Sequence, residues 1–186
     1  MKLIIGMTGA TGAAIGVRIL AVLKDLGVET HLVISKWARA TIQLETPYSV
    51  QDVIALASKT YSEHDQAAAI SSGSFRVDGM IVVPCSMKTL AAIRCGYSDG
   101  LIARAADVTL KEQRKLVLVP RESPLNAIHL ENMLALTRAG ALMLPPMPAF
   151  YNNPATTDDI INHCVSRILD QFGIDNELTR RWGQAH

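Results

Sequence analysis

Residues 2–26 read KLIIGMTGATGAAIGVRILAVLKDL, and this stretch decides the fold. Its first part, Lys2–Gly6, is a short apolar run of the length expected for a buried strand. The run ends in the loop Met7–Gly12, whose glycines permit a tight turn and close approach of the backbone. Beyond the loop, apolar residues recur at helical spacing: Ile15, Ile19, Val22 and Leu26. The stretch therefore predicts a strand, a Gly/Thr loop and a helix.

The loop is a candidate phosphate site, because backbone N–H groups at a helix start can bind an anion. It is not a P-loop, since no Gly-Lys-Ser/Thr follows at the required spacing. A dinucleotide site favours an acid after the second strand, but the strand expected at about Glu29–Ile34 ends in Ser35 and Lys36. This favours a mononucleotide such as FMN over NAD. The alternative is a tight turn that holds no ligand.

Composition limits the protein class. At 186 residues, one domain with a substantial core is expected, and the formal net charge of +1 gives no reason to expect nucleic-acid binding. Charged residues make up 19% and apolar residues 49%, which favours a homo-oligomer that buries further surface. Neither a signal peptide nor a membrane span is recognised. Three unpaired cysteines predict reduced thiols, a cytoplasmic protein and no zinc site.

Strands and helices alternate along the rest of the chain. Further strands are expected at Gly79–Val83, Lys115–Val119 and Ala141–Leu144. Helices are expected at Lys36–Leu44, Val53–Ala57, Leu90–Ile93, Asp99–Lys111, His129–Thr137 and after a cap at Thr156. The alternation predicts a single Rossmann-like α/β domain over 1–186, with a parallel sheet and helices on both faces. We expect the tail, about 173–186, to dock on a neighbouring subunit.

Polar residues follow the predicted strands and should meet at one edge of the sheet. They are the hydroxyls Thr8, Thr11, Ser35, Ser86 and Thr89, the cations Lys36, Lys88 and Arg121, and the carboxylates Glu45 and Glu122. Such cations and hydroxyls suit phosphate, and a buried Glu122 can act as a general acid.

Each candidate has a structural alternative. Arg121 and Glu122 can form a surface ion pair, and Cys85 can be a small buried residue rather than a nucleophile. His129 can cap a helix rather than act as a base. Helix capping likewise explains the pair Asp158-Asp159 without a metal.

The combined motifs resemble the UbiX/Pad-type flavin prenyltransferases, in order and over nearly the whole chain. They are Met7–Gly12, Ile34–Lys36, Pro84–Leu90, Arg104–Glu112, Val119–Pro124, His129–Met133 and Arg181–Gly183. The resemblance implies that dimethylallyl phosphate alkylates reduced FMN, first at the central-ring nitrogen, and that ring closure follows. It also implies a dodecamer, a UbiD-type decarboxylase that receives the prenylated FMN, and no metal.

The resemblance also implies site residues. Those expected to contact FMN are Gly9, Ala10, Thr11, Ser35, Ser86, Met87, Lys88, Thr89 and Arg121. Those expected to bind dimethylallyl phosphate are Lys111, Arg121, Tyr151, Arg167 and Trp182. Lys111 and Arg167 are remote in sequence from the sheet edge, so neighbouring subunits are their expected source. Glu122, Thr11 and Glu45 are the expected catalytic residues, with Glu122 handling protons at the phosphate and Trp182 offering a π face to an allyl cation.

Two departures from the family pattern concern the site. Thr11 stands where relatives commonly have Ser, and Gly100 where they often have Asn. Two other functions stay open at this point. One is an FMN-dependent decarboxylase of an aromatic or cysteine-derived acid, and the other is a non-catalytic FMN carrier. Neither requires a second phosphate cluster around Lys111, Tyr151 and Arg167.

Overall fold

The computed structural model describes residues 1–183, and a six-stranded sheet lies at its centre. The strands are β1 (Lys2–Met7), β2 (Glu29–Ile34), β3 (Lys59–Tyr61), β4 (Gly79–Cys85), β5 (Lys115–Pro120) and β6 (Leu142–Met143). Their order is β3-β2-β1-β4-β5-β6, and each neighbouring pair is parallel. This is the strand order of doubly wound nucleotide-binding folds, in which the order reverses between the first strands of the two halves. The predicted Rossmann-like α/β class is confirmed.

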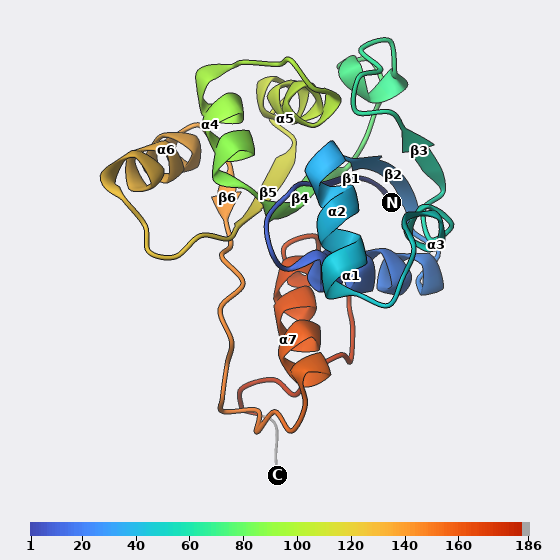
Figure 1. Ribbon diagram of the computed structural model, residues 1–186, viewed down its shortest axis with the longest axis vertical. Helices are drawn as coiled ribbons and strands as arrows, with labels where there is room; N and C mark the ends of the chain where they lie inside the picture. The colour runs from blue at the N-terminus through green and yellow to red at the C-terminus, as the bar shows by residue number, and fades with distance from the viewer. Residues whose placement is uncertain (184–186) are drawn as a thin grey trace.

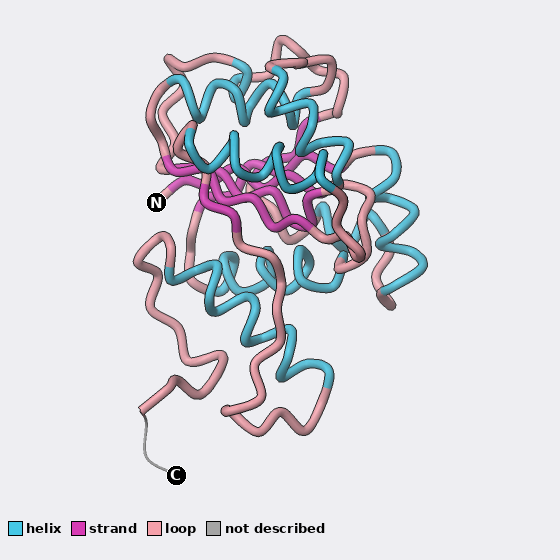
Figure 2. The backbone as a smooth tube through the Cα atoms, turned by 90° about the vertical axis from the view of Figure 1, so that its left-hand side faces the viewer, coloured by secondary structure: helices cyan, strands magenta, loops and turns pink. Residues whose placement is uncertain are grey.

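Helices cover both faces of the sheet. They are α1 (Ala13–Asp25), α2 (Lys36–Glu45), α3 (Val50–Ile54), α4 (Met87–Cys95), α5 (Leu101–Lys111), α6 (Ala127–Arg138) and α7 (Thr157–Asp170), with a short 3₁₀ turn at Ala69–Ser71. Seen edge-on, the sheet lies between two helical layers (Figure 2). Helices α1 and α7 pack together on one side, whereas α4 and α5 pack on the other (Figure 1).

The alternation of β1 explains the two layers. Leu3, Ile5 and Met7 face the core that α1 and α7 complete, whereas Ile4 faces the core that α4 and α5 complete. Gly16 brings α1 close to the sheet, because a Cβ there would lie 2.8 Å from the Met7 side chain and from the Val83 carbonyl oxygen. The buried strand, the loop and the amphipathic helix predicted for residues 2–26 are therefore all present.

The structure adds one strand that the sequence analysis did not predict. β3 occupies three residues of the polar stretch 58–78 and pairs with β2 through His31, Leu32 and Val33. The remaining elements agree within a few residues. The predicted cap Thr156 forms a capping box with Asp159, and Ser49 forms one with Asp52 at the start of α3.

The C-terminal segment that follows α7 packs against other parts of the same chain. After α7, Ile174 and Leu178 pack against the core, and Thr179 accepts a hydrogen bond from Asn152 Nδ2 at 3.1 Å. α7 and this segment extend away from the sheet (Figures 1 and 2). Trp182, near the end of the described residues, keeps 82% of its surface exposed. The expected contact of this tail with a neighbouring subunit stays a prediction.

Candidate functional site

A pocket lies at the carboxyl edge of the sheet, where the strand order reverses between β1 and β4. Thr8 ties the two strand ends together. Its hydroxyl donates to the Pro84 carbonyl oxygen at 2.7 Å and accepts from the Ser86 backbone N–H at 2.8 Å. Thr8 is 1% exposed, so these bonds are shielded from water. The switch point of an open α/β sheet is where ligands bind in this fold class, and Thr8 fixes its width here.

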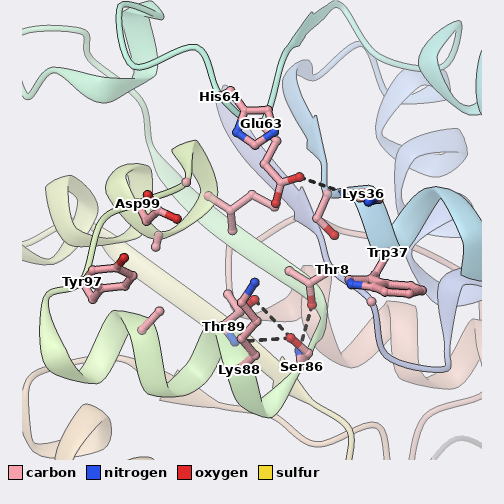
Figure 3. A pocket seen from close by; sticks show the side chains of 16 residues that line it. Thr8, Lys36, Trp37, Glu63, His64, Ser86, Lys88, Thr89, Tyr97 and Asp99 are labelled. Atoms are coloured by element: carbon pink, nitrogen blue, oxygen red, sulfur yellow. Dashed lines mark hydrogen bonds between the residues drawn. The ribbon is translucent and has the colours of Figure 1, made fainter.

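The start of α4 forms one wall of the pocket. Ser86 caps the helix: its hydroxyl accepts from the Thr89 N–H and donates to the Thr89 hydroxyl at 3.1 Å. Lys88 lies in the same first turn and lines the pocket (Figure 3). A helix N-terminus with two hydroxyls and a lysine attracts an anion.

The start of α2 forms the facing wall. Ser35 caps this helix by accepting from the Ala38 N–H, and Lys36 and Trp37 follow in the first turn. The Lys36 N–H donates to Glu63 Oε2 at 2.8 Å, as Figure 3 shows. Glu63 comes from the loop after β3, and its carbonyl oxygen accepts from the Leu101 N–H at 2.8 Å. The loop after β3 therefore joins α2 and α5 around the pocket.

The pocket has a volume of about 390 Å³, within the range of small-molecule and cofactor sites. Its lining residues are Thr8, Gly9, Ser35, Lys36, Trp37, Glu63, His64, Ser86, Lys88, Thr89, Ala92, Tyr97, Asp99, Gly100, Ile102 and Ala103. Lysines, hydroxyls and helix starts suit a phosphate, while Trp37, Ala92 and Ile102 offer apolar surface to a ring system. This set of groups fits FMN.

Five of the predicted FMN contacts line this pocket, namely Gly9, Ser35, Ser86, Lys88 and Thr89. The other four lie close by in the chain: Ala10 and Thr11 in the loop after β1, Met87 at the start of α4, and Arg121 just after β5. The Arg121 N–H donates to the Cys85 carbonyl oxygen at 3.2 Å, which keeps Arg121 at the same sheet edge. Glu122 is exposed beside it and accepts from the Ser123 N–H at 3.1 Å.

Glu45 engages the helix start that the sequence analysis considered for phosphate. Its Oε2 accepts from the N–H groups of Gly12 and Ala13 at 2.8 and 2.9 Å. The carboxylate therefore satisfies two of the donors at the N-terminus of α1. It also joins the end of α2 to the loop that contains Thr11.

Several candidate residues have a structural role in the fold rather than a catalytic one. Cys85 is fully buried, and desolvation raises the pKa of its thiol to about 12, so it stays protonated rather than nucleophilic. His129 caps α6, Asp159 caps α7, and Asp158 pairs with Arg18 at 3.2 Å. Within residues 1–183, no cluster of His, Cys, Asp or Glu is arranged to hold a metal.

Three of the residues expected to bind dimethylallyl phosphate lie around α7, outside the pocket. The Tyr151 ring meets the Trp182 ring edge-on, with centroids 5.2 Å apart, and meets the buried His163 ring at 5.8 Å. Arg167, on the last turn of α7, donates to Asp170 Oδ2 at 2.9 Å. The structure thus brings Tyr151 and Trp182 together and places Arg167 on the same layer.

Lys111 lies elsewhere. It ends α5 and pairs with Glu112, just before β5 begins at Lys115. Because parallel strands all begin at the same edge, Lys111 lies at the edge opposite the pocket. Within one chain, Lys111 and the α7 residues do not line the pocket that holds the predicted FMN contacts.

Four of the residues that line the pocket were not predicted from the sequence. Glu63, His64, Tyr97 and Asp99 come from loops after β3 and before α5. These segments meet through Gln66, whose Nε2 donates to the Asp99 carbonyl oxygen at 3.1 Å. No motif marks Glu63 and His64, because β3 itself was not predicted. Gly100, which was singled out in the sequence, lies next to Asp99 and lines the pocket.

Comparison with known proteins places the chain in its class. Residues 1–169 match the family described as Flavoprotein, so the chain is an α/β flavoprotein. A probable UbiX-like flavin prenyltransferase from Escherichia coli O157:H7 is 68% identical over 183 residues, which cover 98% of this chain and 93% of the relative.

Two solved structures extend this likeness. A dodecameric FMN-dependent Ubix-like decarboxylase from Escherichia coli O157:H7 superposes with a TM-score of 0.97 at 68% identity, covering 99% of this chain and all of the other. AnUbiX (PadA1), solved with FMN and dimethylallyl pyrophosphate, gives a TM-score of 0.98 at 56% identity, covering all of this chain and 98% of the other. The chain belongs to the UbiX-like flavin prenyltransferase family.

Proposed function

We propose that this protein transfers a dimethylallyl group from dimethylallyl phosphate to reduced FMN. The observation that carries this proposal is the pocket at the β1/β4 switch point. Its phosphate-binding groups and apolar wall suit FMN, in a chain that is similar over its full length to a protein solved with FMN and a dimethylallyl donor. In the reaction, the allylic C–O bond breaks, inorganic phosphate leaves, and reduced FMN supplies the nucleophile that joins the C5 unit.

The FMN site uses residues from four chain segments. Gly9, Ala10 and Thr11 approach the flavin from the loop after β1, and Ser35 does so from the cap of α2. Ser86, Met87, Lys88 and Thr89 present the start of α4, and Arg121 joins them from the end of β5. Glu45 holds the loop of Thr11 in place through Gly12 and Ala13.

The donor site requires positive charge where phosphate departs. Lys111, Arg121 and Arg167 supply it, which is the preorganised electrostatic stabilisation that such a transition state needs. Glu122 handles the proton at the phosphate, Tyr151 helps to bind the phosphate, and Trp182 offers a π face to the allyl group. Since Lys111, Tyr151, Arg167 and Trp182 lie away from the pocket of their own chain, we propose that neighbouring subunits contribute them.

Exposed apolar side chains support assembly into a homo-oligomer, for which we propose a dodecamer. Leu44, Phe150 and Trp182 are 83, 71 and 82% exposed in the single chain. Such surface is unusual for a monomer when it is contiguous, and it marks protein interfaces. No helix in residues 1–183 has the length and apolar character of a membrane span. We propose a cytoplasmic enzyme, because its three cysteines are unpaired, and a UbiD-type decarboxylase as the acceptor of its product.

A decarboxylase is the second candidate, because the FMN-dependent relative of the 0.97 superposition is described as one. One experiment separates the two functions. The protein is incubated without oxygen with reduced FMN and either dimethylallyl phosphate or dimethylallyl pyrophosphate, and the flavin is weighed by mass spectrometry. A gain of one C5 unit supports prenyl transfer when phosphate is released from dimethylallyl phosphate, or pyrophosphate from dimethylallyl pyrophosphate. Unmodified FMN together with carbon dioxide release from an aromatic acid supports the decarboxylase, and unmodified FMN alone supports the carrier.

A further inference from the structure

Asp170, the last residue of α7, binds two arginines at once. Its Oδ2 accepts from Arg167 Nη1 at 2.9 Å and from Arg181 Nη1 at 2.9 Å, and its Oδ1 accepts from Arg181 Nη2 at 2.7 Å. The pair with Arg181 is bidentate, the geometry in which an arginine–carboxylate bond is strongest and most directional. The Asp170 side chain is only 18% exposed, so these bonds are partly shielded from water.

Arg181 connects this carboxylate to the end of the tail. The next residue is Trp182, whose ring packs edge-on against Tyr151. Asn152, next to Tyr151, donates to Thr179 of the same tail. The Asp170 carboxylate therefore lies between Arg167 on α7 and the segment that carries Trp182. Both of these residues, with Tyr151, are assigned to the prenyl donor above.

The charges suit a positioning role. The Arg181 guanidinium, with a smaller contribution from Arg167, holds the pKa of the Asp170 carboxyl below its ordinary value, so the group is ionised at neutral pH. Two guanidinium groups share the Asp170 carboxylate, and Asp175 also acts electrostatically on Arg181. Arg167 is bound through Nη1 while half of its side chain stays exposed, which leaves it accessible to an anion.

We propose that Asp170 is a positioning residue for the prenyl donor: it fixes the guanidinium of Arg167 and, through Arg181, the tail that presents Trp182. This inference rests on the proposed function for the identity of the donor. Asp170 itself does not touch the donor in this account. It acts by restricting the rotamers of Arg167, whose ordering would otherwise be part of the cost of binding.

The test is Asp170→Asn, which keeps the shape of the side chain and removes its charge. We expect the Kd of dimethylallyl phosphate for the FMN-loaded protein, measured by calorimetry, and its KM to rise roughly tenfold, the scale of one lost charge-assisted hydrogen bond. The Kd of FMN is expected to stay within about twofold, because the pocket lies away from α7. Arg138→Ala, at the exposed end of α6, is the control for loss of an exposed charge away from the proposed donor site.

A second comparison separates positioning from general damage. Arg167→Ala should weaken donor binding. Adding Asp170→Asn to it should weaken binding by less than Asp170→Asn does alone, because the part of the effect that passes through Arg167 is already lost and only the part through Arg181 is left. Full additivity of the two substitutions, an unchanged donor Kd in Asp170→Asn, or an equal loss of FMN affinity would each overturn the proposal. If the wild-type protein gives no C5 gain, the proposed function fails. The calorimetric comparison still decides the role of Asp170, because it needs no turnover.

Discussion

Thr8 is the residue whose replacement tests the structure of the pocket most directly. Thr8→Val keeps the volume and removes the hydroxyl that joins the end of β1, across the switch point, to Pro84 and Ser86 at the end of β4. The Pro84 carbonyl oxygen keeps a hydrogen bond from the Thr8 N–H at 3.2 Å, but the Ser86 N–H loses its partner. We expect a loss of about 2 kcal/mol, within the range for a buried donor left without an acceptor. For a domain of this size that corresponds to a fall in Tm of about 4–8 °C.

Thr8→Ser is the matched control, because it keeps the hydroxyl and removes only a buried methyl group, at a cost of about 1 kcal/mol. Circular dichroism melts of the FMN-free proteins, at one fixed protein concentration because of oligomerisation, give the two shifts. FMN titration should show weaker binding for Thr8→Val than for Thr8→Ser. If Thr8→Val melts with the wild type, or if Thr8→Ser is the more damaged variant, the hydroxyl bridge does not organise the pocket.

Two further substitutions probe the pocket wall and the α7 layer. In a fluorescence titration, Gly9→Ala should bind FMN at least tenfold more weakly, because its Cβ would lie 2.2 Å from Trp37 Cβ and the start of α2 would have to shift. Gly100→Ala is the control, because its Cβ would have no neighbour closer than 3.8 Å, and it should bind FMN like the wild type. Equal affinities for both variants would contradict the close approach of Gly9 to α2. His163 is buried, and desolvation lowers its pKa below the ordinary value of 6.5. As the pH falls, this histidine is therefore protonated in the unfolded chain at a higher pH than in the folded protein. The free energy of unfolding should decrease as the pH falls below about 6.5. His163→Asn should flatten the fall in Tm between pH 7.5 and 5.5. A slope unaltered by this substitution would refute the assignment.

The sequence predicted those parts of the fold that depend on local patterns. β1, its loop and α1 were recognisable because a buried strand is a continuous apolar run and α1 is amphipathic. β3 was missed because it has three residues, of which only Tyr61 is buried, and so shows no alternation. Its position depends on pairing with β2, a long-range interaction that no local pattern records.

The site residues also fall into those that a local sequence pattern predicts and those that depend on long-range packing. Ser35 and Ser86 were predictable because each directly follows a strand and caps the next helix. Glu63 and Asp99 were not, since the loop after β3 and the loop before α5 meet only once both are packed above the sheet. The bond of Glu45 to the start of α1 is a further case, because it spans 33 residues and depends on how α2 crosses the loop.

The predicted FMN contacts and the residues proposed for the prenyl donor lie in different parts of the chain. The predicted FMN contacts gather where β1, β2, β4 and β5 end, and five of them line a pocket formed within one chain. Tyr151, Arg167 and Trp182 lie on the α7 layer, and Lys111 lies at the opposite edge of the sheet. Under the proposed function, a single chain therefore binds the flavin, but the positive charge needed by the departing phosphate arrives with neighbouring chains. Assembly then completes the reaction site, and contacts such as Asp170–Arg181, far from the flavin, govern transfer without governing FMN affinity.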